Sequence, residues 1–181
     1  MSDRYEIRFA GSGGQGIILA AVITGEAAVI YANLNAVQTQ SYGPEARGGK
    51  SKSEVVISRG EIDYPKTSNP NLQVILNQKA CDEFVGDTSP GGTIILDDTH
   101  VPEKPDVKAE IHALPIVKTA REKVGRELVT NMVALGATAY VLEKEGLLKP
   151  EHLKKAILAR VPKGTEEMNE LAFDEGYALM N

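Results

Sequence analysis

Four glycines lie within six residues of a predicted strand-to-helix corner, in the stretch AGSGGQG at residues 10–16. Gly11, Gly13 and Gly16 match the pattern G-x-G-x-x-G, whose glycines bring the backbone close to the phosphates of a dinucleotide at a helix N-terminus. A complete dinucleotide motif also has an acid at the end of the second strand, about 20 residues on, for the ribose hydroxyls. Here that strand ends in QTQ at residues 38–40, and no Asp or Glu occurs between residues 27 and 44. The corner therefore fits a stand-alone dinucleotide site, another ligand, or close packing without a ligand.

The same corner contains Ser12 in the pattern Ala10-x-Ser12-x-Gly14, a small-residue variant of the nucleophile elbow G-x-S-x-G. A hydrolase of this type needs a His as base and an acid that orients it. The chain has three His residues, at positions 100, 112 and 152, and none lies in a recognisable catalytic context. The elbow of that fold also follows several strands, whereas this corner follows the first. We therefore assign no catalytic residue to the chain.

A second glycine-rich loop, SYGPEARGGK at residues 41–50, follows the second predicted strand. Because the carboxyl ends of parallel strands meet at one edge of a sheet, both loops should open at the edge where α/β proteins bind ligands. Within residues 41–52, Arg47, Lys50 and Lys52 outnumber Glu45, so this stretch is locally positive in an acidic protein. Arg47 could bind a carboxylate or a phosphate, and the alternative is a solvated turn with a Glu45–Arg47 pair. The candidate binding residues of the two loops are Gly11, Gly13, Gly14, Gln15, Gly16, Ser41, Tyr42, Glu45, Arg47, Gly48 and Gly49.

The composition argues against several classes of protein. A net charge of −5, no Trp and 5% aromatic residues do not suit a general nucleic-acid binder, which needs a basic face and stacking platforms. Cys81 is the only cysteine, so this chain alone cannot form an internal disulfide, hold an iron–sulfur cluster or build a cysteine-based zinc site. The start MSDRYEIRF lacks a signal-peptide pattern, and no apolar run reaches the roughly 18 residues of a membrane helix. We expect a cytoplasmic protein with no membrane contact and no metal site of its own.

Predicted strands and helices alternate through most of the chain, and the C-terminal third is helical. The predicted strands are residues 5–10, 35–40, 51–58, 72–77, 93–96 and 111–114. The predicted helices are residues 15–32, 79–85, 115–123, 130–144, 150–161 and 166–180. This alternation indicates an α/β fold with a mostly parallel sheet covered on both faces. A length of 181 residues suits a single domain over residues 1–181.

The first predicted helix has an unusual composition. Between residues 17 and 32 it reads IILAAVITGEAAVIYA, with Glu26 as the only charge. A helix on the outside of a free monomer should show a polar face. Burial of the whole helix inside its own domain is one explanation, but it is difficult in so short a chain. We therefore expect a subunit interface on the outer side of this helix.

Four segments of the chain resemble the gamma subunit of 2-oxoacid:ferredoxin oxidoreductases, most closely its 2-oxoglutarate branch, with the pyruvate and 2-oxoisovalerate branches similar. They are GSGGQGIILAAVITGEAA, QTQSYGPEARGGKSKSEVVIS, TNMVALGA and RVPKGTEEMNELAF, and they span nearly the whole chain. The second segment is long and unusual in composition, so chance agreement is improbable. The resemblance implies a three-layer α/β/α sandwich with a mixed sheet, of the pyruvate/ketoisovalerate oxidoreductase gamma type.

The resemblance also implies an assembled enzyme that decarboxylates a 2-oxoacid on thiamine diphosphate, transfers the acyl unit to coenzyme A and reduces ferredoxin. Thiamine diphosphate, Mg and the iron–sulfur clusters would then belong to alpha, beta and, in some members, ferredoxin-like delta subunits, and the isolated chain should be inactive. The nearest approach here to the thiamine motif Gly-Asp-Gly is Gly86-Asp87-Thr88. Without its partners the chain should self-associate through its apolar surface. A generic interaction domain without a ligand is the further alternative.

Overall fold

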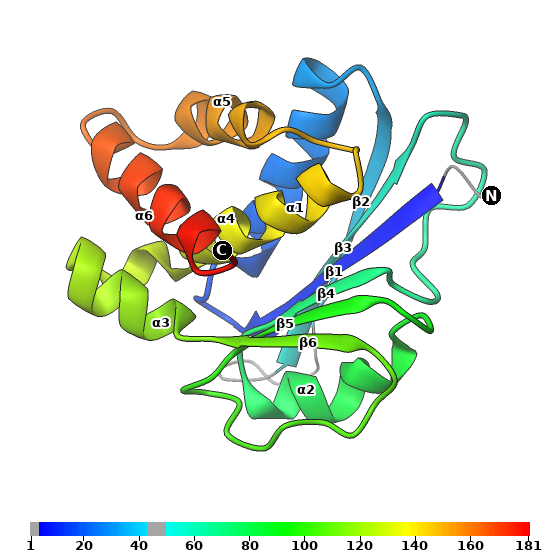
Figure 1. Cartoon of the computed structure of the whole chain (residues 1–181). Helices are drawn as coiled ribbons and strands as arrows, with labels where there is room; N and C mark the ends of the chain where they lie inside the picture. The colour runs from blue at the N-terminus through cyan, green and yellow to red at the C-terminus, as the bar shows by residue number, and fades with distance from the viewer. Residues whose placement is uncertain (1–3, 43–49) are drawn as a thin grey trace.

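A computed structural model describes residues 4–42 and 50–181, which form a mixed six-stranded sheet with helices on both faces (Figure 1). The strands follow the chain in the order β1 (Arg4–Ser12), β2 (Asn35–Tyr42), β3 (Lys50–Ser58), β4 (Leu72–Ile75), β5 (Thr93–Asp97) and β6 (Glu110–Leu114). Their order across the sheet is β2-β3-β1-β4-β5-β6. The predicted α/β class with a mixed sheet is confirmed.

Strand β3 is the one antiparallel member among the described strands. It lies between β2 and β1 and pairs antiparallel with both, whereas β1, β4, β5 and β6 pair in parallel. Strands β1 and β2 therefore run in the same direction and end at the same edge of the sheet. The register places Ser12 opposite Lys50 and Tyr42 opposite Ser51, so the two predicted loop positions meet at one edge, as expected.

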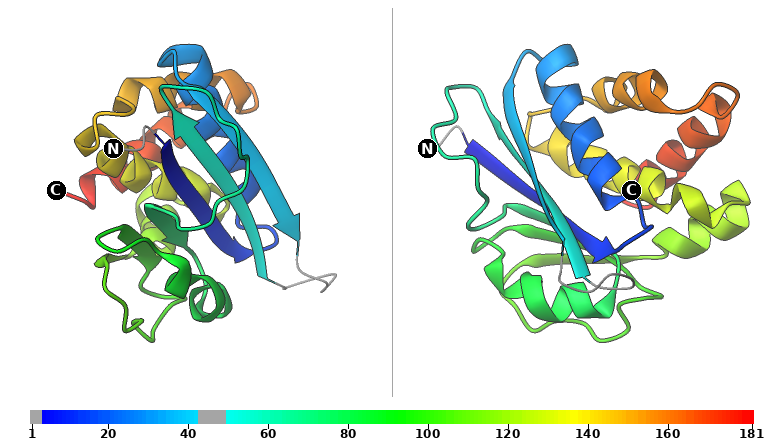
Figure 2. Two further views of the ribbon diagram at one scale, coloured as in Figure 1. Left: turned by 90° about the vertical axis from the view of Figure 1, so that its right-hand side faces the viewer. Right: turned by 180° about the vertical axis from the view of Figure 1, so that it is seen from behind.

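The two helical layers are unequal in thickness (Figure 2). One face of the sheet carries most of the helices, including the whole C-terminal third, and in the described part of the chain the other face carries α2, a short 3₁₀ turn and loops. The thick layer contains α1 (Ile17–Glu26), the π-helical turn η1 (Ala27–Tyr31), α3 (Ile116–Thr119), the π-helical turn η3 (Ala120–Val124), the 3₁₀ turn η4 (Glu127–Val129), α4 (Thr130–Lys144), α5 (Pro150–Arg160) and α6 (Glu166–Ala178). The thin layer contains α2 (Gln78–Phe84) and the 3₁₀ turn η2 (Val85–Asp87).

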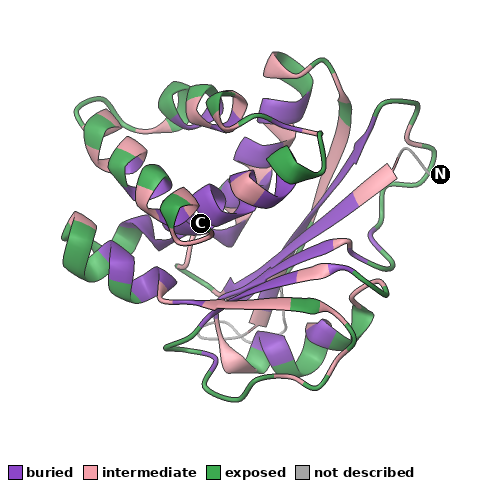
Figure 3. Cartoon of the chain, in the orientation of Figure 1, coloured by how far each residue is buried: buried purple, intermediate pink, exposed green. Residues whose placement is uncertain are grey.

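The main core lies between the sheet and the thick layer (Figure 3). Successive side chains of a strand point to opposite faces, so Ile7 and Phe9 of β1 enter this core. Arg8 lies between them in sequence and faces the thin layer, where it contacts Phe84. A smaller apolar cluster around Ile75 and Cys81 fills the space under α2.

Helix α4 is buried on nearly every side and forms the centre of the thick layer. Its backbone approaches that of α6 so closely that a Cβ at Gly136 would collide with the Phe173 carbonyl, and one at Gly176 with the Val133 carbonyl. These two glycines therefore set the distance between the helices. Within residues 4–42 and 50–181, no helix combines the length and apolar character needed to cross a membrane.

The apolar first helix is buried largely by its own chain. Helix α1 packs on β1, β2 and β3 on one side and on α4 and α5 on the other, which explains most of its apolar residues. Of the outward side that we expected to form an interface, Val29 and Ile30 of η1 are the most exposed large apolar residues, at 51% and 63%.

Candidate functional site

The glycine corner at the end of β1 is closed internally by Gln15. The Gln15 Oε1 atom accepts a hydrogen bond from the Ser12 amide (2.7 Å), and its Nε2 donates to the Leu76 carbonyl oxygen at the end of β4 (3.0 Å). A Cβ at Gly11 would collide with Gln15 Oε1, so glycine is required there for this closure. The Gln15 amide therefore holds two strand ends together, and both of its polar atoms already have partners within the chain.

Gly16 joins the corner to α4. Its φ of 72° lies in the left-handed region, and a Cβ there would lie 2.5 Å from Asn131 Nδ2. The Asn131 side chain, from the first turn of α4, donates a long hydrogen bond of 3.4 Å to the Gly16 carbonyl. Glycine at position 16 is therefore explained by the structure, because it lets the N-terminal ends of α1 and α4 come together.

Gly13 and Gly14 are exposed, and a Cβ at either would find open space. Gly14 has a φ of 90°, which itself favours glycine, but Gly13 has no positive φ. Beside them lies a hollow of about 270 Å³, lined by Gly14, Gln15, Val117, Glu127, Leu128 and Thr130. Nothing in the described part of the chain requires glycine at position 13, so its contact with a ligand or a partner stays a prediction.

The second predicted loop is described only at its ends. Ser41 is exposed at the end of β2, and Lys50 forms an ion pair with Glu83 of α2. Residues 43–49, which include Glu45, Arg47, Gly48 and Gly49, lie outside the described residues, and so does the Tyr42 side chain. The roles predicted for them stay predictions.

Lys52 and Glu54 of β3 belong to a cluster of charges that the sequence did not reveal, and Arg8 lies buried at its centre. Arg8 is only 2% exposed, and it donates to Glu54 Oε1 (2.7 Å) and Asp87 Oδ2 (2.5 Å). Lys52 Nζ lies 3.1 Å from the same Glu54 oxygen, and Phe84 covers the Arg8 guanidinium at 5.4 Å. Asp87, the acid of the thiamine-like Gly86-Asp87-Thr88 stretch, is thus occupied in an ion pair and does not fit a cofactor-metal site.

The dinucleotide interpretation gains no support from the neighbouring strands. Strand β2 ends without an acid, and it is separated from β1 by β3. The parallel neighbour of β1 is β4, which is followed by Leu76 and Asn77. The Asn77 side chain caps α2 by accepting from the Ala80 amide (2.8 Å). Among the described residues, neither β2 nor β4 ends in a carboxylate that could bind the ribose hydroxyls of a dinucleotide.

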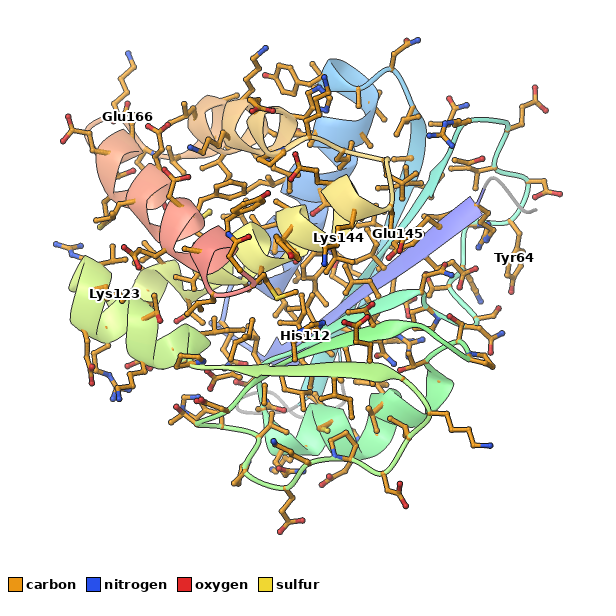
Figure 4. All side chains as sticks on the ribbon, viewed as in Figure 1. Tyr64, His112, Lys123, Lys144, Glu145 and Glu166 are labelled. Carbon is orange, nitrogen blue, oxygen red and sulfur yellow. The ribbon has the colours of Figure 1, made fainter. Side chains whose placement is uncertain are left out.

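The three His residues are each bound to a close neighbour in sequence. His100 contacts the buried Asp97 (2.9 Å), and His152 accepts from the Lys149 amide (3.2 Å). His112 on β6, labelled in Figure 4, contacts Glu110 at 3.0 Å. In the part of the chain that the structure describes, no hydrogen bond joins a His to Ser12, and no group of three His, Cys, Asp or Glu side chains could hold a metal.

The single thiol is also unsuited to catalysis. Cys81 is buried, and desolvation, helped by the charge of Asp82, raises its pKa to about 11. The thiol is therefore protonated at neutral pH, and a protonated thiol is a poor nucleophile.

Comparison with known proteins identifies the family. The pattern of the family described as pyruvate ferredoxin/flavodoxin oxidoreductase matches residues 6–179. The 2-oxoglutarate synthase subunit KorC of Methanocaldococcus jannaschii is 49% identical over 97% of this chain and 94% of its own length. A crystal structure of the gamma subunit of a keto/oxoacid ferredoxin oxidoreductase from Geobacter sulfurreducens has a TM-score of 0.89 at 45% identity, over 98% of this chain and 96% of that one.

The same fold also occurs within a longer chain. A 2-oxoglutarate:ferredoxin oxidoreductase from Magnetococcus marinus matches 99% of this chain with a TM-score of 0.86 at 22% identity, and the match covers 31% of that chain. At that identity the likeness concerns the fold alone. On the match to residues 6–179 and the near full-length relatives, this chain belongs to the pyruvate ferredoxin/flavodoxin oxidoreductase family.

Proposed function

We propose that this chain is the gamma subunit of a 2-oxoacid:ferredoxin oxidoreductase complex and that the complex oxidises 2-oxoglutarate. The observation that carries this proposal is the 49% identity to a 2-oxoglutarate synthase subunit along nearly the full length of both chains. The agreement in length matters because a shared segment alone would support only a shared fold. In this proposal residues 1–181 act as one gamma-type domain in the cytoplasm.

The described residues support a non-catalytic role for this subunit. They bring together no nucleophile with a base, and Asp87 is paired with Arg8. Thiamine diphosphate with Mg, and the iron–sulfur clusters, would supply decarboxylation and electron transfer to ferredoxin from partner alpha, beta and delta subunits. This chain would bind and position those partners, and alone it would be inactive.

We further propose that the shared edge of β1 and β2 faces the alpha subunit or the path by which coenzyme A enters. Gly13 is exposed without a structural need for glycine, and it follows Ser12, which lies opposite Lys50 in the register. An exposed backbone and a locally positive segment suit an anionic group. Arg47 is the residue we assign to that contact.

Arg47→Gln in the assembled enzyme tests this assignment. We expect an increase of at least about tenfold in the apparent KM for coenzyme A, because a guanidinium contact to a phosphate contributes more than 1.4 kcal/mol when partly desolvated. Arg59→Gln is the matched control, since Arg59 follows the far end of β3 and donates to the Gly146 carbonyl. Equal kinetics of the two variants and the wild type would remove Arg47 from the site.

The subunit assignment is tested by co-purification. The tagged chain, expressed with its candidate partner subunits, should bring down a complex that contains thiamine diphosphate and iron. Omission of this chain should abolish formation of acyl-CoA. A chain that purifies alone and binds a dinucleotide in calorimetry would support the stand-alone alternative instead, and a chain that binds neither would be a generic interaction domain.

A further inference from the structure

A shallow groove runs between the end of the first helix and the edge of the sheet. It has a volume of about 300 Å³, and its lining includes Val29 and Ile30 of η1 and Ala36 and Gln38 of β2. Val29 is 51% exposed and Ile30 63%, which is high for adjacent branched apolar residues. The groove is separate from the hollow at the glycine corner, because the two share no lining residue.

Strand β2 forms one wall of this groove and is an edge of the sheet (Figure 2). Among the described residues no strand pairs with its outer side. Proteins usually protect such an edge with charges, Pro or a short strand, but β2 is eight residues long and reads NAVQTQSY, without a charge or Pro. The opposite edge, β6, has five residues and carries Glu110 and His112. The edge formed by β2 is therefore open to another uncharged strand.

The charges of this surface allow it to meet an identical copy of itself. In a two-fold symmetric interface the same residues lie on both sides, so an uncompensated charge faces its own copy and is repelled. Strand β2 has no charge, and Glu26 is the one ionisable residue in the described lining of the groove. Both carboxylate oxygens of Glu26 accept hydrogen bonds from Arg160 (2.6 and 2.5 Å). The surface is therefore neutral in a chain whose net charge of −5 opposes self-association elsewhere.

The geometry of β2 also suits pairing with its own copy. A two-fold axis at the middle of the strand would set two β2 strands antiparallel and join the sheets of the two copies. Gln38 pairs with Val55 of β3, which belongs to the core under α1, so Gln38 and, by alternation, Ala36 and Gln40 face the helical side. In an antiparallel pair the first half of one strand meets the second half of the other. Gln40 of the second copy would therefore lie beside the groove and help to cover its apolar residues.

We propose that β2 and this groove form an interface between two copies of this chain, in which the two β2 strands pair antiparallel across a two-fold axis. The second copy is the occupant that the structure itself supplies, because every copy carries an open, uncharged edge strand of the same length. Backbone hydrogen bonds hold the two strands together, as in other edge-to-edge pairs. The hollow at the glycine corner is not part of this interface, so the proposal does not depend on the proposed function.

The mass of the chain alone in solution tests the interface. Sedimentation velocity over a range of concentrations should show an equilibrium between monomer and dimer. Gln38→Lys should raise the dissociation constant of the dimer at least about tenfold, because it brings like charges together at the middle of the paired strands. Ile30→Lys should do the same, because it buries a charge in the apolar groove.

Leu171→Lys is the matched control, since Leu171 is an exposed apolar residue of α6 that does not line the groove. Circular dichroism and the melting temperature of each variant would show that folding is intact. A wild-type chain that stays monomeric at every concentration would overturn the proposal. So would groove variants that dimerise as tightly as the control.

Disulfide scanning tests the arrangement without a disruptive charge. Single Cys substitutions along residues 36–40 should form a disulfide-linked dimer most readily at the middle of the strand, because only a residue at the two-fold axis faces its own copy. The buried Cys81 should not compete. Linkage that is equal at all five positions, or absent from all of them, would contradict the antiparallel pair.

Hydrogen exchange distinguishes a second copy from other occupants of the edge. Amide exchange in residues 35–42 should slow as the concentration of the chain alone rises, and exchange in β6 should not change. Protection of residues 35–42 that appears only when another subunit is added would assign the edge to that subunit and overturn the proposal. Because all the supporting results come from the chain alone, their failure would leave the proposed function standing.

Discussion

Gly16 and Gly13 lie three residues apart in the same corner, and the structure gives them opposite roles. Gly16→Ala would place a side chain in the left-handed region, which costs about 1–2 kcal/mol. It would also force the new Cβ against Asn131, 2.5 Å away, and overpacking of this kind costs about 1–3 kcal/mol. A central value of about 3 kcal/mol corresponds to a decrease of about 6–12 °C in the melting temperature of a domain this size.

Gly13→Ala should leave stability unchanged within about 0.5 kcal/mol, because its Cβ has open space and its φ needs no glycine. It should instead reduce the activity or affinity of the assembled complex if an outside group approaches this backbone. Urea unfolding of the free subunit, with equal m-values, would measure the stability of both variants. The control variant Asn131→Ala, alone and combined with Gly16→Ala, would isolate the collision as a coupling energy. A Gly16→Ala variant as stable as the wild type, or a Gly13→Ala variant as unstable as Gly16→Ala, would refute this reasoning.

Three further predictions concern stability and reactivity. Gly176→Ala should destabilise the protein by about 1–3 kcal/mol or more in urea unfolding, because its Cβ would strike the backbone of α4. Gly86→Ala, which meets open space, is its control and should be neutral. Arg160→Gln should destabilise the protein at neutral pH but not in acid. The hydrogen bond from Arg160 lowers the pKa of Glu26 from its ordinary value of 4.5. The pair therefore stabilises the folded protein above pH 4.5, and this stabilisation is lost as the pH falls through the folded-state pKa of Glu26. Melting curves of variant and wild type should therefore converge in acid, and a difference that persists at low pH would contradict the pairing. Cys81 should resist thiol reagents at pH 8 in the folded protein and react on unfolding; rapid labelling of the native protein would show that its burial is wrong.

The alternation of strands and helices was sufficient to predict the fold class and nearly all the elements. It did not predict that β3 runs antiparallel, although one signal was present. Only residues 41–50 separate the second and third predicted strands, and a parallel crossover needs a dozen residues or more. The short connection without a helix therefore favoured an antiparallel neighbour, and this would have placed β3 beside β2 correctly.

The shared edge of β1 and β2 was predictable from the sequence, but the contacts at that edge were not. The glycine patterns located the shared edge of β1 and β2, because strand ends follow directly from the order of elements. The partners of Arg8 lie 46 and 79 residues away in sequence, so local patterns could not identify them. The burial of the first helix could not be assigned from the sequence for a similar reason. A helix covered by the C-terminal helices of the same chain and a helix covered by another subunit would both have apolar residues on all sides.

Gln15 shows most clearly what the structure adds. From the sequence, Gln15 was one of several residues predicted to bind a ligand at the edge of the sheet. In the structure its side chain bonds the Ser12 amide and the Leu76 carbonyl, so it belongs to the architecture of the corner. Gly13 and Gly14 are the members of the motif that remain open to an outside group.

The most direct test of the central claim is the substrate preference of the complex reconstituted with this chain. The rate of ferredoxin reduction should be measured with 2-oxoglutarate, pyruvate and 2-oxoisovalerate as alternative substrates, each with coenzyme A present. We predict that kcat/KM is highest for 2-oxoglutarate and that activity is lost when this chain is omitted. A complex that prefers pyruvate or 2-oxoisovalerate, or that works equally well without this chain, would contradict the account.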